Sequence, residues 1–192
     1  MKGRPIEYDE KNVVLNAQRI FWEKGYVATS LNDLKNATKL GSGSLYNAFK
    51  GGKKELFSKA IQQRRIDFED FKIELSKSDN PLGVVKDFFL KLADNNAEVH
   101  RRGCIIANSV TELSFIDEDL ENEALKILLE VEDMFTEVIL YAQNHNQTSN
   151  KTNARVLGRY LVTLWNGLNV TRRMHTEAST LKSLIKFQLS VI

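Results

Sequence analysis

The most reactive side chain in the sequence is its single cysteine, Cys104, which follows Arg101 and Arg102. An apolar run at residues 105–107 comes directly after it, so the thiol is expected at the start of a helix. A helix N-terminus and neighbouring arginines both favour the thiolate, which is the form that attacks electrophiles and oxidants. Cys104 is therefore a candidate sensor of such compounds. The alternative is a small buried apolar residue, a common state of a free cysteine.

Catalytic and metal-binding patterns are otherwise missing from the sequence. His100, His145 and His175 are far apart and form no metal-ligand spacing such as H-x-x-x-H. His100 and Cys104 are four residues apart, but they straddle the expected helix start, which argues against a nucleophile–base pair. There is no glycine-rich phosphate loop and no G-x-S-x-G motif. We therefore predict that the chain is not an enzyme and uses no cofactor or metal.

A second group of residues has the composition of a DNA-binding surface. Ser42, Gly43 and Ser44 are small residues at the expected start of a short helix, where free backbone N–H groups favour phosphate. Tyr46 and Asn47 project away from the inner face of this helix, so Tyr46 could donate to a phosphate and Asn47 could read a base edge. Basic residues that could add phosphate contacts are Lys2, Arg4, Lys50, Lys53 and Lys54.

The elements that would position these residues are three short helices. Asp9 can cap a first helix that Gly25 ends, and Ser30 with Asp33 has the spacing of a capping box for a second. A tight turn at residues 39–41 separates this second helix from a third at about residues 42–49. Two short helices joined by a tight turn, after a supporting helix, predict a helix-turn-helix whose second helix enters the DNA major groove.

The remaining sequence also has helical periodicity, without strand alternation. Six further helices are expected at about residues 53–75, 81–97, 103–113, 117–143, 154–174 and 178–191. We predict an all-α fold of about nine helices, with a helix-turn-helix DNA-binding domain at residues 1–52 and a ligand-binding and dimerisation domain at residues 53–192. Apolar residues that could pair with a second copy recur at Leu157, Leu161, Leu164, Leu168, Leu181, Leu184, Ile185 and Leu189.

Composition and charge agree with this division. Of 192 residues, 42% are hydrophobic and 27% are charged, which provides enough apolar material for a sizeable core. No apolar run approaches the ~18 residues of a membrane helix, and a lone cysteine fits a reducing cytoplasm. The net charge of +2 is uneven, because residues 1–54 carry 10 Lys/Arg against 5 Asp/Glu and the rest carries 17 against 20. This asymmetry predicts an anionic partner for the N-terminal part.

The stretch at residues 21–49, FWEKGYVATSLNDLKNATKLGSGSLYNAF, resembles the N-terminal domain of the TetR family of transcriptional repressors. This resemblance implies an all-α homodimer in which Thr29, Ser44 and Tyr46 contact phosphates, while the recognition helix reads a palindromic operator in double-stranded DNA. A K-x-L-F run at residues 54–57 opens the fourth helix, as in the family. The family's recurrent positions are matched by Phe21, Gly25, Tyr26, Thr29, Ser30, Leu45, Tyr46 and Phe49.

Two features depart from the family pattern. Lys39 stands in the turn where the family often has glycine, so a non-glycine residue is expected to take a left-handed conformation at a cost of order 1 kcal/mol. The connection at residues 50–52 is about one residue longer than usual, which affects where Lys53 and Lys54 lie relative to the phosphates.

The large, aromatic-rich C-terminal part predicts a small-molecule effector that relieves repression, with the helix at residues 53–75 as the lever. Candidate effector-binding residues are Phe115, Phe135, Trp165, Asn108, Glu112 and Asn169, together with Cys104. Aromatic stripes also form ordinary core, and buried polar groups also pair with backbone. The run RGCIIANSVTEL at residues 102–113 resembles a stretch of TetR-type proteins that includes sensors of electrophiles and oxidants.

A carrier of apolar ligands, or an interaction scaffold built from the same helices, is the alternative to a DNA-binding regulator. The affinity of a DNA-binding protein falls steeply with added salt, because counterions are released from the DNA. Salt dependence therefore distinguishes the two functions.

Overall fold

The computed structural model describes residues 8–94 and 96–192, and within them all regular structure is helical. The predicted all-α fold is therefore confirmed. Lys2 and Arg4 lie outside the described residues. The helices are α1 (Glu10–Lys24), α2 (Leu31–Thr38), α3 (Ser42–Ala48), α4 (Gly52–Lys77), α5 (Pro81–Lys91), α6 (Ala97–Arg102), α7 (Ile105–Leu113), α8 (Glu118–Asn144), α9 (Ala154–Met174) and α10 (Ala178–Leu189), with a short 3-10 helix at Leu92–Asp94.

The first three helices form where their capping residues predict. The Asn12 backbone N–H donates to Asp9 Oδ1 at 3.3 Å at the start of α1, and Ser30 and Asp33 form a reciprocal capping box before α2. Lys39 ends α2 with a φ of 59°, so the predicted left-handed residue is confirmed. The buried side chains that hold the three helices together include Phe21, Leu34, Leu45 and Phe49.

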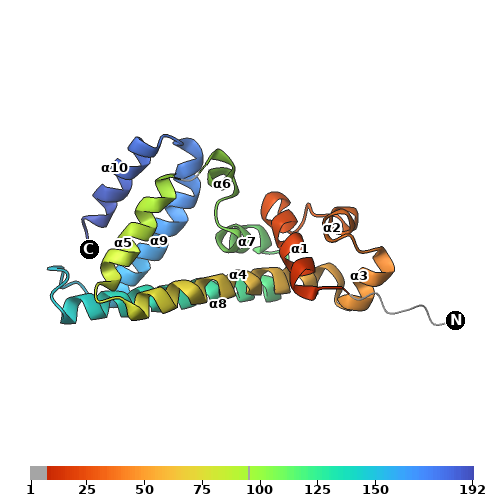
Figure 1. Ribbon diagram of the computed structural model, residues 1–192, viewed down its shortest axis with the longest axis horizontal. Helices are drawn as coiled ribbons and strands as arrows, with labels where there is room; N and C mark the ends of the chain where they lie inside the picture. Colours follow the sequence, from red (N-terminus) through yellow and green to blue (C-terminus); the bar gives the residue numbers. More distant parts are fainter. Residues whose placement is uncertain (1–7, 95) are drawn as a thin grey trace.

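Two long helices, α4 and α8, run along the length of the molecule (Figure 1). α4 begins beside α3 and continues to the opposite end of the molecule, where α5 starts. Polar contacts join the two helices, since Ser58 Oγ donates to Glu123 Oε2 at 2.7 Å and Arg65 Nε donates to Glu130 Oε2 at 2.5 Å. The N-terminal helices are thus connected to the rest of the protein by one continuous helix.

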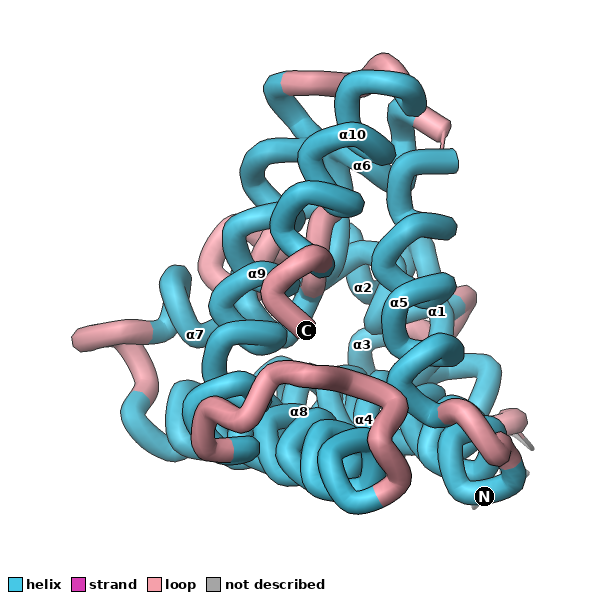
Figure 2. Tube along the Cα trace, turned by 90° about the vertical axis from the view of Figure 1, so that its left-hand side faces the viewer, coloured by secondary structure: helices cyan, strands magenta, loops and turns pink. Residues whose placement is uncertain are grey.

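At the opposite end from α1–α3, the helices α5, α9 and α10 stand over the α4–α8 pair (Figures 1 and 2). Their core is aromatic, with the Trp165 ring stacked on Phe88 at 5.3 Å and Phe89 5.9 Å from Phe135, measured between ring centroids. The short helices α6 and α7 lie between this end and α1 (Figure 1). They are the elements that bring the C-terminal part against the N-terminal helices.

Two details differ from the sequence-based expectations. The helix expected at residues 81–97 ends as α5 at Lys91, and α6 is a separate helix that begins after Asn96. Asn96 accepts from the Val99 backbone N–H at 3.0 Å, so its side chain caps a new helix instead of continuing the old one. The second difference concerns dimerisation, because most of the apolar residues proposed to face a second copy are buried inside the chain. These are Leu157, Leu161, Leu164, Leu168, Leu181, Ile185 and Leu189.

Within the described residues, no helix has both the length and the apolar character required to cross a membrane. The same residues contain no group of three or more His, Cys, Asp or Glu side chains placed to hold a metal ion.

Candidate nucleic-acid interface and effector site

The start of α3 is open to an approaching partner. Gly41 precedes the helix without a side-chain cap, so the first backbone N–H groups of α3 are left for an external acceptor. A Cβ atom added to Gly41 or Gly43 would meet nothing within 4 Å. Tyr46 is 52% exposed, and Asn47 and Lys50 are also exposed. Ser42 and Ser44 are half-buried beside them. The predicted recognition surface is thus brought together on one short helix.

Thr29 and Lys54 have different surroundings from those implied by the sequence. Thr29 is 1% exposed, and its hydroxyl donates to the Gly25 carbonyl at 2.6 Å. Lys54 points to α8, where its Nζ lies 2.9 Å from Asp117 Oδ1 and 2.7 Å from Asp119 Oδ2. The hydrogen bonds to Asp119 and Asp117 raise the pKa of Lys54. In this conformation the Thr29 hydroxyl holds a turn and Lys54 joins two helices, so a phosphate would compete with contacts inside the protein for both side chains.

Lys53 is also engaged within the protein. Its ammonium lies 4.6 Å from the centroid of the Tyr26 ring and donates to the Val27 carbonyl at 3.3 Å. Desolvation by burial lowers the pKa of Lys53. Of Lys50, Lys53 and Lys54, the exposed cation that is left for an external phosphate is therefore Lys50.

Cys104 lies at the N-cap of α7, as predicted, and it is buried with 5% exposure. A buried arginine from a distant helix, Arg172, interacts electrostatically with it. Arg172 is 4% exposed, and its Nε has no hydrogen-bond acceptor among the described residues. Desolvation lowers the pKa of Arg172, and its electrostatic interaction with Cys104 acts in the opposite direction. The basic residues that interact with the thiol therefore include Arg172, which sequence analysis did not identify.

The polar residues proposed for an effector site lie around this position. Asn169 Oδ1 accepts from Arg172 at 2.7 Å, and its Nδ2 donates to the Trp165 carbonyl at 2.8 Å. Asn108 Nδ2 donates to the Arg102 carbonyl at 3.0 Å. Both amides therefore have partners within the protein, which is the alternative left open by the sequence.

The three aromatic candidates are not brought together. Phe135 and Trp165 are packed in the aromatic core of the C-terminal end. Phe115 lies between α7 and α8 with a φ of 65° and is fully exposed. Its predicted place in a cavity wall is wrong for the single chain, because the left-handed turn that follows α7 directs it into solvent.

Glu112 connects the two parts of the molecule. Its Oε2 accepts from the Tyr26 backbone N–H and its Oε1 from that of Val27, both at 2.8 Å. Gly25, directly before these residues, has a φ of 81°, and a Cβ there would lie 2.6 Å from Glu112 Oε1. The glycine thus provides both the left-handed turn and the space that the carboxylate needs. Sequence analysis singled out Glu112 but could not identify the turn after α1 as its partner.

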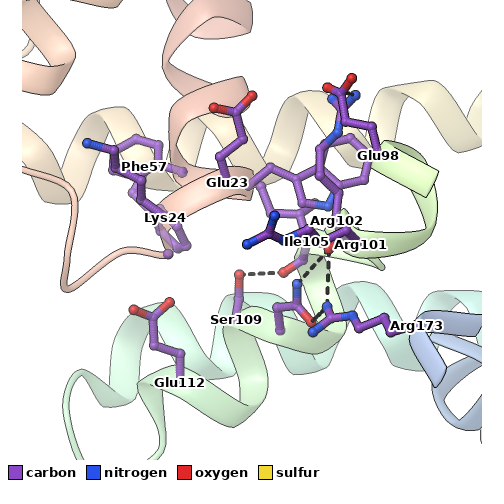
Figure 3. A pocket seen from close by; sticks show the side chains of 14 residues that line it. Glu23, Lys24, Phe57, Glu98, Arg101, Arg102, Ile105, Ser109, Glu112 and Arg173 are labelled. Atoms are coloured by element: carbon purple, nitrogen blue, oxygen red, sulfur yellow. Dashed lines mark hydrogen bonds and ion pairs between the residues drawn. The ribbon is translucent and has the colours of Figure 1, made fainter. Parts of the chain in front are cut away.

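A cleft of about 690 Å³ opens beside this contact (Figure 3). We call it the junction cleft, because it lies between the end of α1 and the helices α6 and α7. Of the residues predicted from the sequence, it brings together Asn108 and Glu112. The other lining residues are Phe21, Trp22, Glu23, Lys24, Gly25, Phe57, Glu98, Arg101, Arg102, Ile105, Ser109 and Arg173.

Two family models match the chain, one in its N-terminal part and one in its C-terminal part. Residues 15–60 match the family described as "Bacterial regulatory proteins, tetR family". Residues 84–187 match the family described as "Tetracyclin repressor-like, C-terminal domain". The second match covers more than half of the chain.

Relatives of similar length were found among characterised and uncharacterised regulators. The HTH-type transcriptional repressor ComR of Escherichia coli is 25% identical over 189 residues, covering 96% of this chain and 88% of ComR. The uncharacterized HTH-type transcriptional regulator YezE of Bacillus subtilis is 26% identical, with 99% of both chains covered. The HTH-type transcriptional repressor DhaR of a Mycobacterium species is 24% identical, covering 82% of this chain and 78% of DhaR.

Solved structures share the fold along nearly the whole chain. A cysteine mutant of the TetR family transcriptional regulator CifR, in complex with a 26-bp operator DNA, has a TM-score of 0.80 at 22% identity and covers 98% of both chains. The reduced form of Escherichia coli NemR has a TM-score of 0.83 at 14% identity, covering 95% of this chain and 96% of NemR.

Proposed function

Because this chain belongs to the TetR family of bacterial regulatory proteins, we propose that it is a homodimeric repressor that releases a palindromic operator in response to an effector. The chain is a DNA-binding transcriptional regulator by family. The repressor role is supported by its similarity to ComR and DhaR, both of which are named repressors. As a regulator of bacterial DNA it acts in the cytoplasm, by binding and not by catalysis.

The observation that carries this proposal is the open, uncapped start of α3. Free N–H groups, exposed Tyr46 and Asn47, and outward Lys50 form one surface on a helix that a buried core supports. Such a surface fits the major groove, with phosphate contacts at its edges and base contacts at its centre. Residues 1–52 are accordingly the proposed DNA-binding domain, and residues 53–192 are the proposed effector and dimerisation domain.

Release is proposed to begin in the C-terminal part, by either of two kinds of effector. A small apolar ligand would act through packing against α4, α7 or α8. A reactive electrophile would act on Cys104, the thiol at the start of α7, which interacts electrostatically with buried Arg172. Either change is transmitted through α4 and through the Glu112 contact to the turn after α1.

Selection of duplexes from a random pool, followed by titration of the chosen duplex at increasing salt, tests the proposal. We expect one palindromic sequence to be selected, with an affinity that falls steeply as salt rises, because Lys and Arg displace counterions from phosphates. A protein that selects no sequence, and whose affinity for duplexes is negligible at low salt, would instead be a helical carrier or interaction protein.

A further inference from the structure

The junction cleft has the size and position of a regulatory binding site. Its volume of about 690 Å³ is within the usual range for sites that hold small molecules, roughly 300–1,000 Å³. Its walls come from α1 and α4 on one side and from α6, α7 and α9 on the other. An occupant would therefore touch both the helix-turn-helix and the C-terminal part.

Several arginine donors in this cleft lack acceptors. Arg101 is exposed and makes no hydrogen bond or ion pair with any described residue. The Nε of Arg102 is buried and has no acceptor among the described residues. Among the described residues, Arg173 makes two long hydrogen bonds, each 3.3 Å, from one guanidinium nitrogen to the Arg102 carbonyl and to Asn108 Oδ1. A guanidinium has five N–H donors, so most of this capacity is unused.

Among the described residues, the acidic side chains of the cleft form no ion pair with Arg101 or Arg173. Glu112 is occupied by two backbone N–H groups, and Glu98 Oε1 accepts from the Arg102 NH2 nitrogen at 2.8 Å. Figure 3 shows the carboxylates of Glu23 and Glu98 directed away from Arg173. Arg101 and Arg173 are therefore left without a carboxylate partner among the described residues.

Apolar surface adjoins these donors. Phe21, Phe57 and Ile105 line the cleft and belong to the buried core. Trp22 is fixed in the wall, since its indole N–H donates to the Gly103 carbonyl at 3.2 Å and its ring lies 5.7 Å from the Arg102 guanidinium. A flat apolar body would rest against the half-buried Trp22 side chain, while a carboxylate would accept from Arg101 and Arg173.

We propose that the junction cleft binds a small organic carboxylate with an aromatic body, and that this ligand is an effector. The carboxylate oxygens accept from the exposed guanidinium groups of Arg101 and Arg173. Because Glu112 holds the turn after α1 at the wall of the cleft, the bound ligand shifts α7 against the helix-turn-helix. The binding site stands on its own, and only its effect on operator DNA rests on the proposed function.

Isothermal titration calorimetry of the full chain, without DNA, tests the binding site with 2-naphthoate as the probe. We expect saturable binding with one ligand per chain. Neutral 2-naphthamide has nearly the same shape and should bind at least about ten-fold more weakly, because a charge-assisted hydrogen bond to arginine is lost. Inorganic phosphate, which has charge but no aromatic body, should also bind at least about ten-fold more weakly than 2-naphthoate.

Variants locate the binding in the cleft. Arg101→Gln should weaken 2-naphthoate binding at least about ten-fold, whereas Arg101→Lys should restore part of it. Arg19→Gln, which removes an exposed arginine of α1 outside the cleft, should bind as the unmodified protein does. Absence of saturable binding, equal binding of the amide or of phosphate, or equal loss in the Arg19 variant would each overturn the assignment.

A second titration follows operator binding by fluorescence anisotropy while 2-naphthoate is added. Release of the DNA at ligand concentrations that match calorimetric binding is expected. Calorimetric binding without release would remove the effector role and leave the binding site, whereas failure of the protein to bind any duplex would count against the proposed function alone.

Discussion

Tyr46 and Asn47 are neighbours on α3 but are expected to contact different parts of DNA. Tyr46→Ala should weaken binding to the selected operator and to random duplex by a similar factor, about five- to ten-fold, because a phosphate contact carries no sequence information. Asn47→Ala should change the preferred sequence, since loss of a base contact costs roughly 1–3 kcal/mol at one position. Anisotropy titrations and repeated selection with both variants test this. Two variants with unchanged affinity and preference would contradict the placement of α3 in the groove.

A maleimide provides a direct test of Cys104, the one thiol in the chain. We expect the thiolate to add across the maleimide double bond, and mass spectrometry and anisotropy should show modification and operator release at the same rate. Cys104→Ser should bind operator normally and stay bound. Arg172→Gln should slow the modification several-fold, because it removes a buried positive charge that interacts with Cys104 and that would stabilise negative charge developing on the sulfur during attack. Equal release of the native and Cys104→Ser proteins would exclude the thiol from the switch.

Residues with local partners were predictable, and residues with distant partners were not. The Ser30–Asp33 box and the left-handed Lys39 follow from neighbours a few positions away. Glu112 pairs with Tyr26 across 86 residues, and Lys54 pairs with Asp119 across 65, so only the fold identifies these contacts. One pattern in the sequence could have identified Arg172 as a buried residue, because it falls four residues after Leu168 on the buried face of α9. A charge on such a face requires a partner inside the protein.

At the scale of elements, the start of α8 is fixed by one aspartate with two roles. Asp117 Oδ1 accepts from the Leu120 backbone N–H at 3.2 Å as the helix cap, and it also pairs with Lys54 of α4. The hydrogen bond from Lys54 is the main reason that the pKa of Asp117 is lowered. The charged carboxylate therefore stabilises the folded state above its unfolded pKa of about 3.9, and this stability is lost as pH falls through the lower, folded pKa.

Two substitutions at this position separate the cap from the charge. Asp117→Ala should lower the free energy of unfolding by about 1 kcal/mol at pH 7, because the cap is lost. Asp117→Asn keeps an acceptor for the Leu120 N–H, so at pH 7 its free energy of unfolding should fall less than that of Asp117→Ala. Between pH 5 and 2, the stability of the Asn variant should fall less than that of the native protein. Urea denaturation over this pH range gives the comparison. Identical acid dependence in the native and Asn proteins would show that the Lys54 pair contributes nothing.

At the scale of the whole molecule, the face of α9 that is left uncovered differs from the one expected. The leucines of α9 pack inward, and the opposite stripe carries Val156, Thr163, Gly167, Val170 and Met174, all of which are exposed. On α10, Phe187 is 76% exposed. A Cβ atom added to Gly167 would meet nothing within 4 Å, so a second helix could approach closely there. Periodicity predicted two apolar stripes on these helices but could not show which stripe the chain itself covers.

This uncovered stripe is the proposed surface for the second copy, and its disruption should affect both assembly and DNA binding. Val170→Glu places a charge where an apolar partner is expected, so the protein should sediment as a monomer at micromolar concentration. Ile66→Glu, at an exposed apolar residue of α4, is the matched control and should remain dimeric.

Loss of the dimer should also weaken binding to the operator. A palindromic operator engages two recognition helices about 34–36 Å apart. In a dimer, binding of one helix raises the effective concentration of the other at its half-site, and a monomer lacks this advantage. The Val170 variant should therefore bind the operator at least about 100-fold more weakly, while its affinity for a single half-site should equal that of the native protein. A Val170→Glu protein that stays dimeric would move the interface elsewhere, and a monomeric variant with native operator affinity would show that dimerisation is not needed for recognition.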